Sequence, residues 1–87
     1  MDKYVEYFRC LGCNDRIKII NLLDDRELTP TQLQKHFNLE QSTVSYHINR
    51  LKKAGILTCR RDGKELLYRL SKGSLNKIFQ EFMSIIS

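Results

Sequence analysis

The stretch from Gln41 to Leu57, QSTVSYHINRLKKAGIL, decides the fold. Its apolar residues Val44, Ile48 and Leu51 recur at i, i+4 and i+7, a spacing that predicts a helix with one side facing a core. Gly55 follows a basic run and has the position and residue type of a left-handed helix cap. We therefore expect a helix over roughly residues 41–54.

The opposite side of this helix is polar and carries short hydroxyls, amides, a tyrosine and an arginine: Gln41, Ser42, Thr43, Ser45, Tyr46, Asn49 and Arg50. Short hydroxyls at the front of a helix let the backbone approach a ligand closely and can hydrogen-bond phosphates or base edges. Gln, Asn and Arg are side chains that pair with base edges in the major groove. The pattern predicts that this side of the helix contacts duplex DNA.

The segment before it, LTPTQLQKHF, predicts another helix. Thr29 is expected to cap it, Pro30 to take its first position and Gln32 to complete a capping box. Two helices joined by a short turn form a helix-turn-helix, whose second helix enters the major groove by its N-terminal residues.

After Gly55 the pattern becomes alternating, with ILTCRR and ELLYRLS on either side of DGK. Asp-Gly between extended segments is a strong hairpin signal. Arg60, Arg61 and Lys64 surround the expected tip. We expect this hairpin to act as a wing that contacts the DNA backbone or minor groove.

Helical spacing is also found near both ends of the chain. Residues 2–12 and 73–86 predict terminal helices, and residues 15–23 predict a further helix capped by Asn14, with its Ile and Leu residues, Ile17 included, facing inward. Two wide apolar faces are one too many for the core of so small a domain, so we expect the terminal helices to form a homodimer. The expected interface residues are Tyr4, Val5, Phe8, Leu75, Phe79, Phe82 and Ile86.

The charge distribution supports an anionic partner. The 87 residues carry a net charge of +5, but residues 41–72 hold eight Lys/Arg against two Asp/Glu, an excess of +6. Nucleic acid is the commonest partner of such a basic block. No apolar run approaches the roughly 18 residues of a membrane span, and the N-terminus lacks a signal-peptide layout, so we expect a cytoplasmic protein without a membrane contact.

The segment from Leu28 to Ser71, above all QSTVSYHINRLKKAGIL and RRDGKELLYRL, resembles the ArsR/SmtB family of winged helix-turn-helix repressors. The resemblance implies a homodimer that binds an inverted-repeat operator in double-stranded DNA and is usually released by a metal or another inducer. It also implies DNA contacts at Gln41, Ser42, Thr43, Ser45 and Tyr46, with support from Asn49 and Arg50, and wing contacts at Arg60, Arg61 and Lys64. Glu40 departs from the serine that is common at its position.

The family's metal sites have no counterpart in this sequence. Thr29 and Thr31 stand where the family's Cys-x-Cys motif would lie, and the last helix has no His or Asp. Cys10 and Cys13 remain as sensor candidates, because three residues apart on one helix they would share a face. The simpler interpretation is that they are buried small side chains. We expect no cofactor.

The whole chain, residues 1–87, is therefore expected to be one mainly α winged helix-turn-helix domain with a small β-hairpin, in the order four helices, two strands and one helix. The predicted function is that of a sequence-specific DNA-binding repressor and not of an enzyme, because no nucleophile–base motif is found. A winged-helix protein-interaction module without DNA binding is the main alternative, and a module that binds double-stranded RNA is a weaker one.

Overall fold

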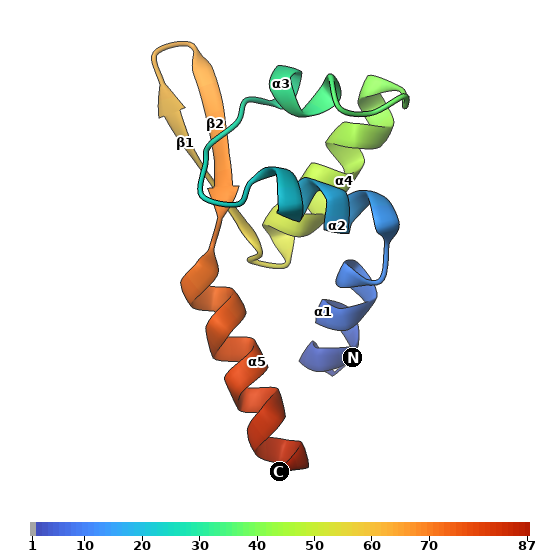
Figure 1. Cartoon of the computed structure of the whole chain (residues 1–87), viewed down its shortest axis with the longest axis vertical. Helices are drawn as coiled ribbons and strands as arrows, with labels where there is room; N and C mark the ends of the chain where they lie inside the picture. Colours follow the sequence, from blue (N-terminus) through green and yellow to red (C-terminus); the bar gives the residue numbers. More distant parts are fainter. Residues whose placement is uncertain (1) are drawn as a thin grey trace.

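The computed structural model describes residues 2–87 and has the predicted order of elements (Figure 1). The helices and strands are α1 (Lys3–Leu11), α2 (Asn14–Leu22), α3 (Pro30–Gln34), α4 (Gln41–Lys53), β1 (Leu57–Asp62), β2 (Glu65–Leu70) and α5 (Lys72–Ile86). Figure 1 shows α2, α3, α4 and the hairpin gathered at one end, while α5 projects away from them toward the C-terminus. The mainly α fold with one hairpin is confirmed.

Three local signals act as the sequence predicts. Thr29 and Gln32 form a reciprocal capping box with Pro30 in the first turn of α3. Gly55 ends α4 in a left-handed conformation, with a φ of +81° that a residue without a Cβ adopts easily. The hairpin closes at the pair Asp62 and Glu65, and Gly63 takes the positive φ that a two-residue turn requires at its first central position.

The third helix is shorter than predicted. It ends at Gln34, and the next turn is tightened by bonds of the i→i−3 type, from the His36 N–H to the Leu33 carbonyl and from the Phe37 N–H to the Gln34 carbonyl. The Gln34 amide also donates to the Leu39 carbonyl at 2.7 Å. These bonds form a compact connection between α3 and α4.

Two expectations for α2 are wrong. Asn14 is the first residue of the helix and Cys13 is its cap, because the Ile17 N–H bonds the Cys13 carbonyl. Ile17 is 41 % exposed. The buried residues Ile19 and Leu23 set the inward face, and a residue two positions from Ile19 lies about 200° around the helix.

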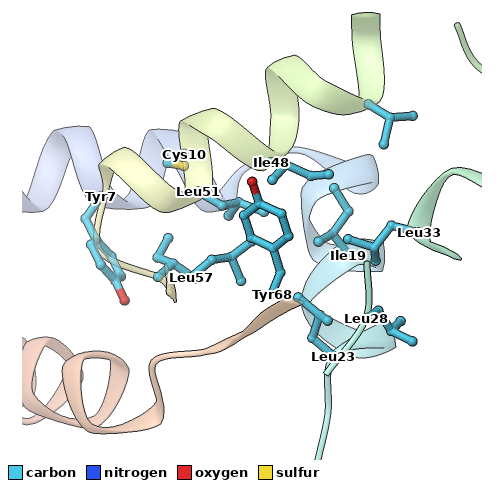
Figure 2. Close-up of a cluster of buried hydrophobic side chains, with 12 residues drawn as sticks. Tyr7, Cys10, Ile19, Leu23, Leu28, Leu33, Ile48, Leu51, Leu57 and Tyr68 are labelled. Atoms are coloured by element: carbon cyan, nitrogen blue, oxygen red, sulfur yellow. The ribbon is translucent and has the colours of Figure 1, made fainter. Parts of the chain in front are cut away.

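The core joins α4 to every other part of the helix-turn-helix (Figure 2). It contains Tyr7, Cys10, Ile19, Leu23, Leu28, Leu33, Val44, Ile48, Leu51, Ile56, Leu57 and Tyr68. Leu28 and Tyr68 exchange two backbone hydrogen bonds, which tie the segment before α3 to β2. The hairpin is thus held against the same core as α4.

The two terminal helices contact each other within the chain through aromatic rings. The ring centroids of Phe8 and Phe82 are 4.9 Å apart, and those of Tyr4 and Phe82 are 5.5 Å apart. Phe79 lies 5.9 Å from Phe8, and Lys3 forms a 2.9 Å ion pair with Glu81. Part of the apolar surface that the sequence assigned to a dimer is therefore already used inside one chain.

Apolar side chains nevertheless remain exposed on these helices. α5 has no buried residue, and its exposed large side chains include Met83 at 56 % and Ile86 at 61 %. We call the exposed apolar residues of α1 and α5 the terminal surface; they are Val5, Phe79, Met83, Ile85 and Ile86. Leu75 is half-buried, as are Tyr4, Phe8 and Phe82.

Candidate nucleic-acid interface

The front of α4 presents a polar surface to solvent. We call its exposed side chains the recognition face; they are Gln41, Ser42, Thr43, Tyr46 and Asn49. Tyr46 is 53 % exposed, whereas Val44 and Ile48 on the other side are buried. Ser45 is half-buried in a small depression beside Thr31 and Gln34 of α3.

The start of α4 lacks a side-chain cap. Glu40 occupies the cap position, and its carboxylate accepts no bond from the first turn, while its backbone carbonyl accepts from Thr43 and Val44. The first N–H groups of a helix have no partner within the helix, so they can donate hydrogen bonds to a phosphate. Glu40 therefore leaves donors available at this end, although its own charge opposes an anion.

Polar contacts with α2 hold α4 in place behind the recognition face. The side chain of His47 is mostly buried, and its Nδ1 accepts a hydrogen bond of 3.2 Å from the Nε of Arg16. The Nε2 of His47 lies 3.8 Å from a carboxylate oxygen of Asp15. Arg16 also donates to the Cys10 carbonyl at 3.0 Å. No spacing in the sequence marked Asp15 or Arg16 for this role.

Arg50 does not join the recognition face. Its side chain is half-buried, its Nε is buried without a hydrogen-bond partner, and it lines a cavity with Tyr7 and Cys10 of α1. One turn separates Arg50 from Tyr46, but the side chain lies toward α1. The structure thus separates Arg50 from the other proposed DNA contacts.

The three basic residues of the wing are not equivalent. Arg60 forms two hydrogen bonds with Glu27, of 2.8 and 3.0 Å, whereas Arg61 and Lys64 are exposed and make no ion pair within residues 2–87. Neighbouring strand residues face opposite sides, which explains why Arg60 reaches Glu27 and Arg61 does not. The hydrogen bond from Arg60 lowers the pKa of the Glu27 carboxyl.

A second ion pair also reduces the basic excess of residues 41–72. Lys72 contacts Asp25 at 2.5 Å and Asp24 at 3.5 Å. The hydrogen bond from Lys72 lowers the pKa of Asp25. The fold thus pairs two of the eight basic residues with acids from before α3, and the sequence alone did not reveal either pair.

Cys10 and Cys13 do not share a helix face. Cys10 is buried near the end of α1 and its Sγ lies 3.7 Å from the Arg50 carbonyl, while Cys13 lies beyond the end of α1. The expectation of a shared face is wrong because the helix stops at Leu11. In the part of the chain that the structure describes, no group of three or more His, Cys, Asp or Glu is arranged to hold a metal ion.

None of the helices within residues 2–87 is long and apolar enough to cross a membrane.

Comparisons with known proteins agree with this geometry. Residues 13–58 match the model of a family described as "Bacterial regulatory protein, arsR family". The chain is 33 % identical over 72 residues to the arsenical resistance operon repressor of Staphylococcus aureus, covering 83 % of this chain and 69 % of that protein. It is 28 % identical over 80 residues to the transcriptional repressor SdpR of Bacillus subtilis, covering 92 % of this chain and 89 % of the repressor.

A solved structure has the same fold. It is the homodimeric winged helix-turn-helix DNA-binding domain of a possible ArsR-family regulator from Mycobacterium bovis, with a TM-score of 0.77 and 21 % identity. The match covers 98 % of this chain and 79 % of that one. The family match, the two repressors and the α3–α4–hairpin geometry lead to one conclusion: this chain belongs to the arsR family of bacterial regulatory proteins and has a winged helix-turn-helix fold.

Proposed function

We propose that this chain is a cytoplasmic, non-enzymatic repressor that binds double-stranded DNA as a homodimer. The observation that carries the proposal is the recognition face: the front of α4 is polar, exposed and next to open backbone N–H groups. The named relatives, an operon repressor and a transcriptional repressor, support the same function.

The proposed DNA contacts are divided between helix and wing. Gln41, Ser42, Thr43, Ser45, Tyr46 and Asn49 would contact the major groove, where Gln and Asn side chains pair with adenine and hydroxyls contact several base edges. Arg61 and Lys64 would contact the neighbouring backbone, and Arg60 would do so only by leaving Glu27. Arg50 is left out because its side chain lies toward α1.

The terminal surface supports a homodimer. Met83, Ile85 and Ile86 are more than half exposed at the end of α5 that projects from the domain, and burial of such side chains favours association. The homodimeric domain of similar fold supports this arrangement. Two copies of α4 related by a two-fold axis would then reach successive major grooves, about one helical turn apart.

Fluorescence anisotropy with a random-sequence DNA duplex tests the proposal. The dimer would carry a net charge of 2 × 5 = +10, so we expect binding that weakens steeply as salt increases. The A-form RNA duplex of the same sequence serves as competitor. Absence of DNA binding at low salt would favour the protein-interaction module, and equal competition by RNA would favour the RNA-binding alternative.

A further inference from the structure

A cavity of about 490 Å³ lies between α1, the C-terminal end of α4 and the first turns of α5. Its walls include Tyr7, Arg50, Lys53, Ala54, Ser74 and Ile78. This volume is within the range of pockets that bind small molecules. No residue of the recognition face or of the wing lines this cavity. Of the two cysteines considered as sensors, only Cys10 does.

Two buried polar groups at this cavity lack partners. Tyr7 is only 7 % exposed, and its hydroxyl makes no hydrogen bond; the Nε of Arg50 is also buried without one. Figure 2 shows the Tyr7 ring directed away from α1 toward the side on which α5 lies. Buried polar groups are nearly always hydrogen-bonded, because leaving one unpaired costs about 1–3 kcal/mol. Both atoms are closed off from solvent in the free chain, so an acceptor bound in the cavity would reach them after a small movement of the Tyr7 and Arg50 side chains.

The charges around the cavity identify the kind of acceptor. Lys3 is paired with Glu81, and Glu6 lies 3.5 Å from Arg9. The remaining charges are Arg50 and Lys53, neither of which makes an ion pair within residues 2–87. Two positive charges without a counter-ion favour an anion.

The backbone around the cavity is compatible with an anion. The C-terminal end of α4 contributes partial negative charge, which opposes an anion. Its last carbonyls accept hydrogen bonds, including that of Arg50 from Ala54 and that of Leu51 from Ile56, and these bonds offset part of that charge. Ser74 lies in the first turn of α5. The side chain of the cap residue Ser71 accepts no bond from a backbone N–H of this turn, and it donates to the Ser74 hydroxyl at 2.9 Å. This end of α5 therefore adds positive potential.

We propose that this cavity binds a small organic carboxylate, with the carboxylate on Arg50 and the Tyr7 hydroxyl and its apolar part against Ile78 and Ala54. Tyr7 is suited to donate, because burial raises the pKa of its hydroxyl and keeps the proton on the oxygen. A guanidinium binds a carboxylate through paired hydrogen bonds, which explains an arginine rather than a lysine at this position. The site does not depend on DNA binding.

Amide NMR of the full chain, titrated with butyrate, hexanoate and benzoate, tests the proposal. The matching uncharged amides, butyramide, hexanamide and benzamide, are the controls. We expect saturable shifts around Tyr7, Ala54 and Ser74, with a dissociation constant below about 1 mM for the best carboxylate and at least about tenfold weaker binding of its amide. Absence of saturation, or equal binding of acid and amide, would overturn the proposal.

Substitutions separate a binding role from a structural one. Arg50→Gln should weaken carboxylate binding at least about tenfold, and Lys52→Gln, on the same helix end but outside the cavity, should leave it within about twofold. If Arg50→Gln does not fold, Arg50→Lys should still show a loss beyond about twofold. Unchanged binding in the Arg50 variant that folds would contradict the assignment.

Tyr7→Phe gives a second, independent readout. It removes a hydroxyl that has no partner in the free chain, so the melting temperature should stay the same or rise while carboxylate binding weakens. A clear fall in the melting temperature would mean that the hydroxyl already has a partner. A homodimer structure with a carboxylate of the second copy on Arg50 would likewise overturn the proposal and make the cavity part of the subunit interface.

Discussion

The recognition face and the terminal surface are both exposed, but they have opposite chemistry. The recognition face is built from hydroxyls, amides and a tyrosine on a helix fixed to the core, and the wing adds charges beside it. The terminal surface is built from Val, Phe, Met and Ile on helices at the edge of the fold. The difference indicates two partners: a polyanion for the recognition face, and another apolar surface for the terminal surface.

The largest expected effect is on the terminal surface. Replacing both Met83 and Ile86 by Asp removes two large apolar contacts and adds like charges, so the dimer dissociation constant should rise about a hundredfold or more. Sedimentation equilibrium measures it. Ser84→Asp adds a charge to the same helix about 100° around the axis from Met83, and because it removes no apolar contact its effect on dimerisation should be much smaller. An unaffected dimer in the double variant would place the interface elsewhere.

On the recognition face, substitutions should change sequence preference rather than overall affinity. Gln41→Ala or Tyr46→Ala should cost about 1–3 kcal/mol on a preferred site and much less on random DNA. Parallel selection of bound fragments with the variant and the original protein measures this change. Equal losses on all sequences would mean that these side chains contact only the backbone.

The two adjacent arginines of the wing should contribute unequally to DNA affinity. Arg61→Ala should weaken binding to all sequences about tenfold and reduce the salt slope by about two per dimer, one phosphate for each subunit. Arg60→Ala should have a smaller effect, because Glu27 already holds its guanidinium. Anisotropy titrations at several salt concentrations compare the two, and identical slopes for both variants would contradict the distinction.

The smallest change in DNA affinity should follow substitution of Glu27, the partner of Arg60. Glu27→Gln frees the guanidinium, so DNA affinity should rise by about two- to threefold and the effect of Arg60→Ala should approach that of Arg61→Ala. A double-mutant cycle by anisotropy measures the coupling, and zero coupling would mean that Glu27 does not restrain Arg60.

The same pair should contribute weakly to acid sensitivity. Arg60 lowers the folded-state pKa of Glu27, so the pair stabilises the fold above the ordinary pKa of a glutamate, and this stabilisation is lost as the pH falls through the lowered value. The contribution is small because both groups are at the surface. The melting temperatures of Glu27→Gln and the original protein should therefore differ near neutral pH and become equal as the pH falls to about 3.

The sequence predicted the elements whose signals are local. The capping box at Thr29, the left-handed Gly55 and the turn at Gly63 each depend on a few neighbouring residues, and each is found in the structure. The period of Val44 and Ile48 likewise identified the buried side of α4, and with it the recognition face.

The errors arose where distant residues decide the outcome. The partner of Arg60 is 33 residues away, and Arg50 is half-buried because α1 lies beside α4. Ile17 was placed inward by its type, although the face of α2 is set by packing against α4. Cys13 does not share a helix face with Cys10, because α1 ends at Leu11 and Cys13 caps α2. No short-range pattern carries this information.

Methylation protection of guanines tests the central claim most directly, on a DNA fragment selected by this protein from genomic DNA. A homodimer that inserts two recognition faces should protect guanine N7 atoms in two successive major grooves, with centres about 10 base pairs apart on one side of the duplex. Protection in a single groove, or binding that leaves every major-groove N7 reactive, would contradict the account.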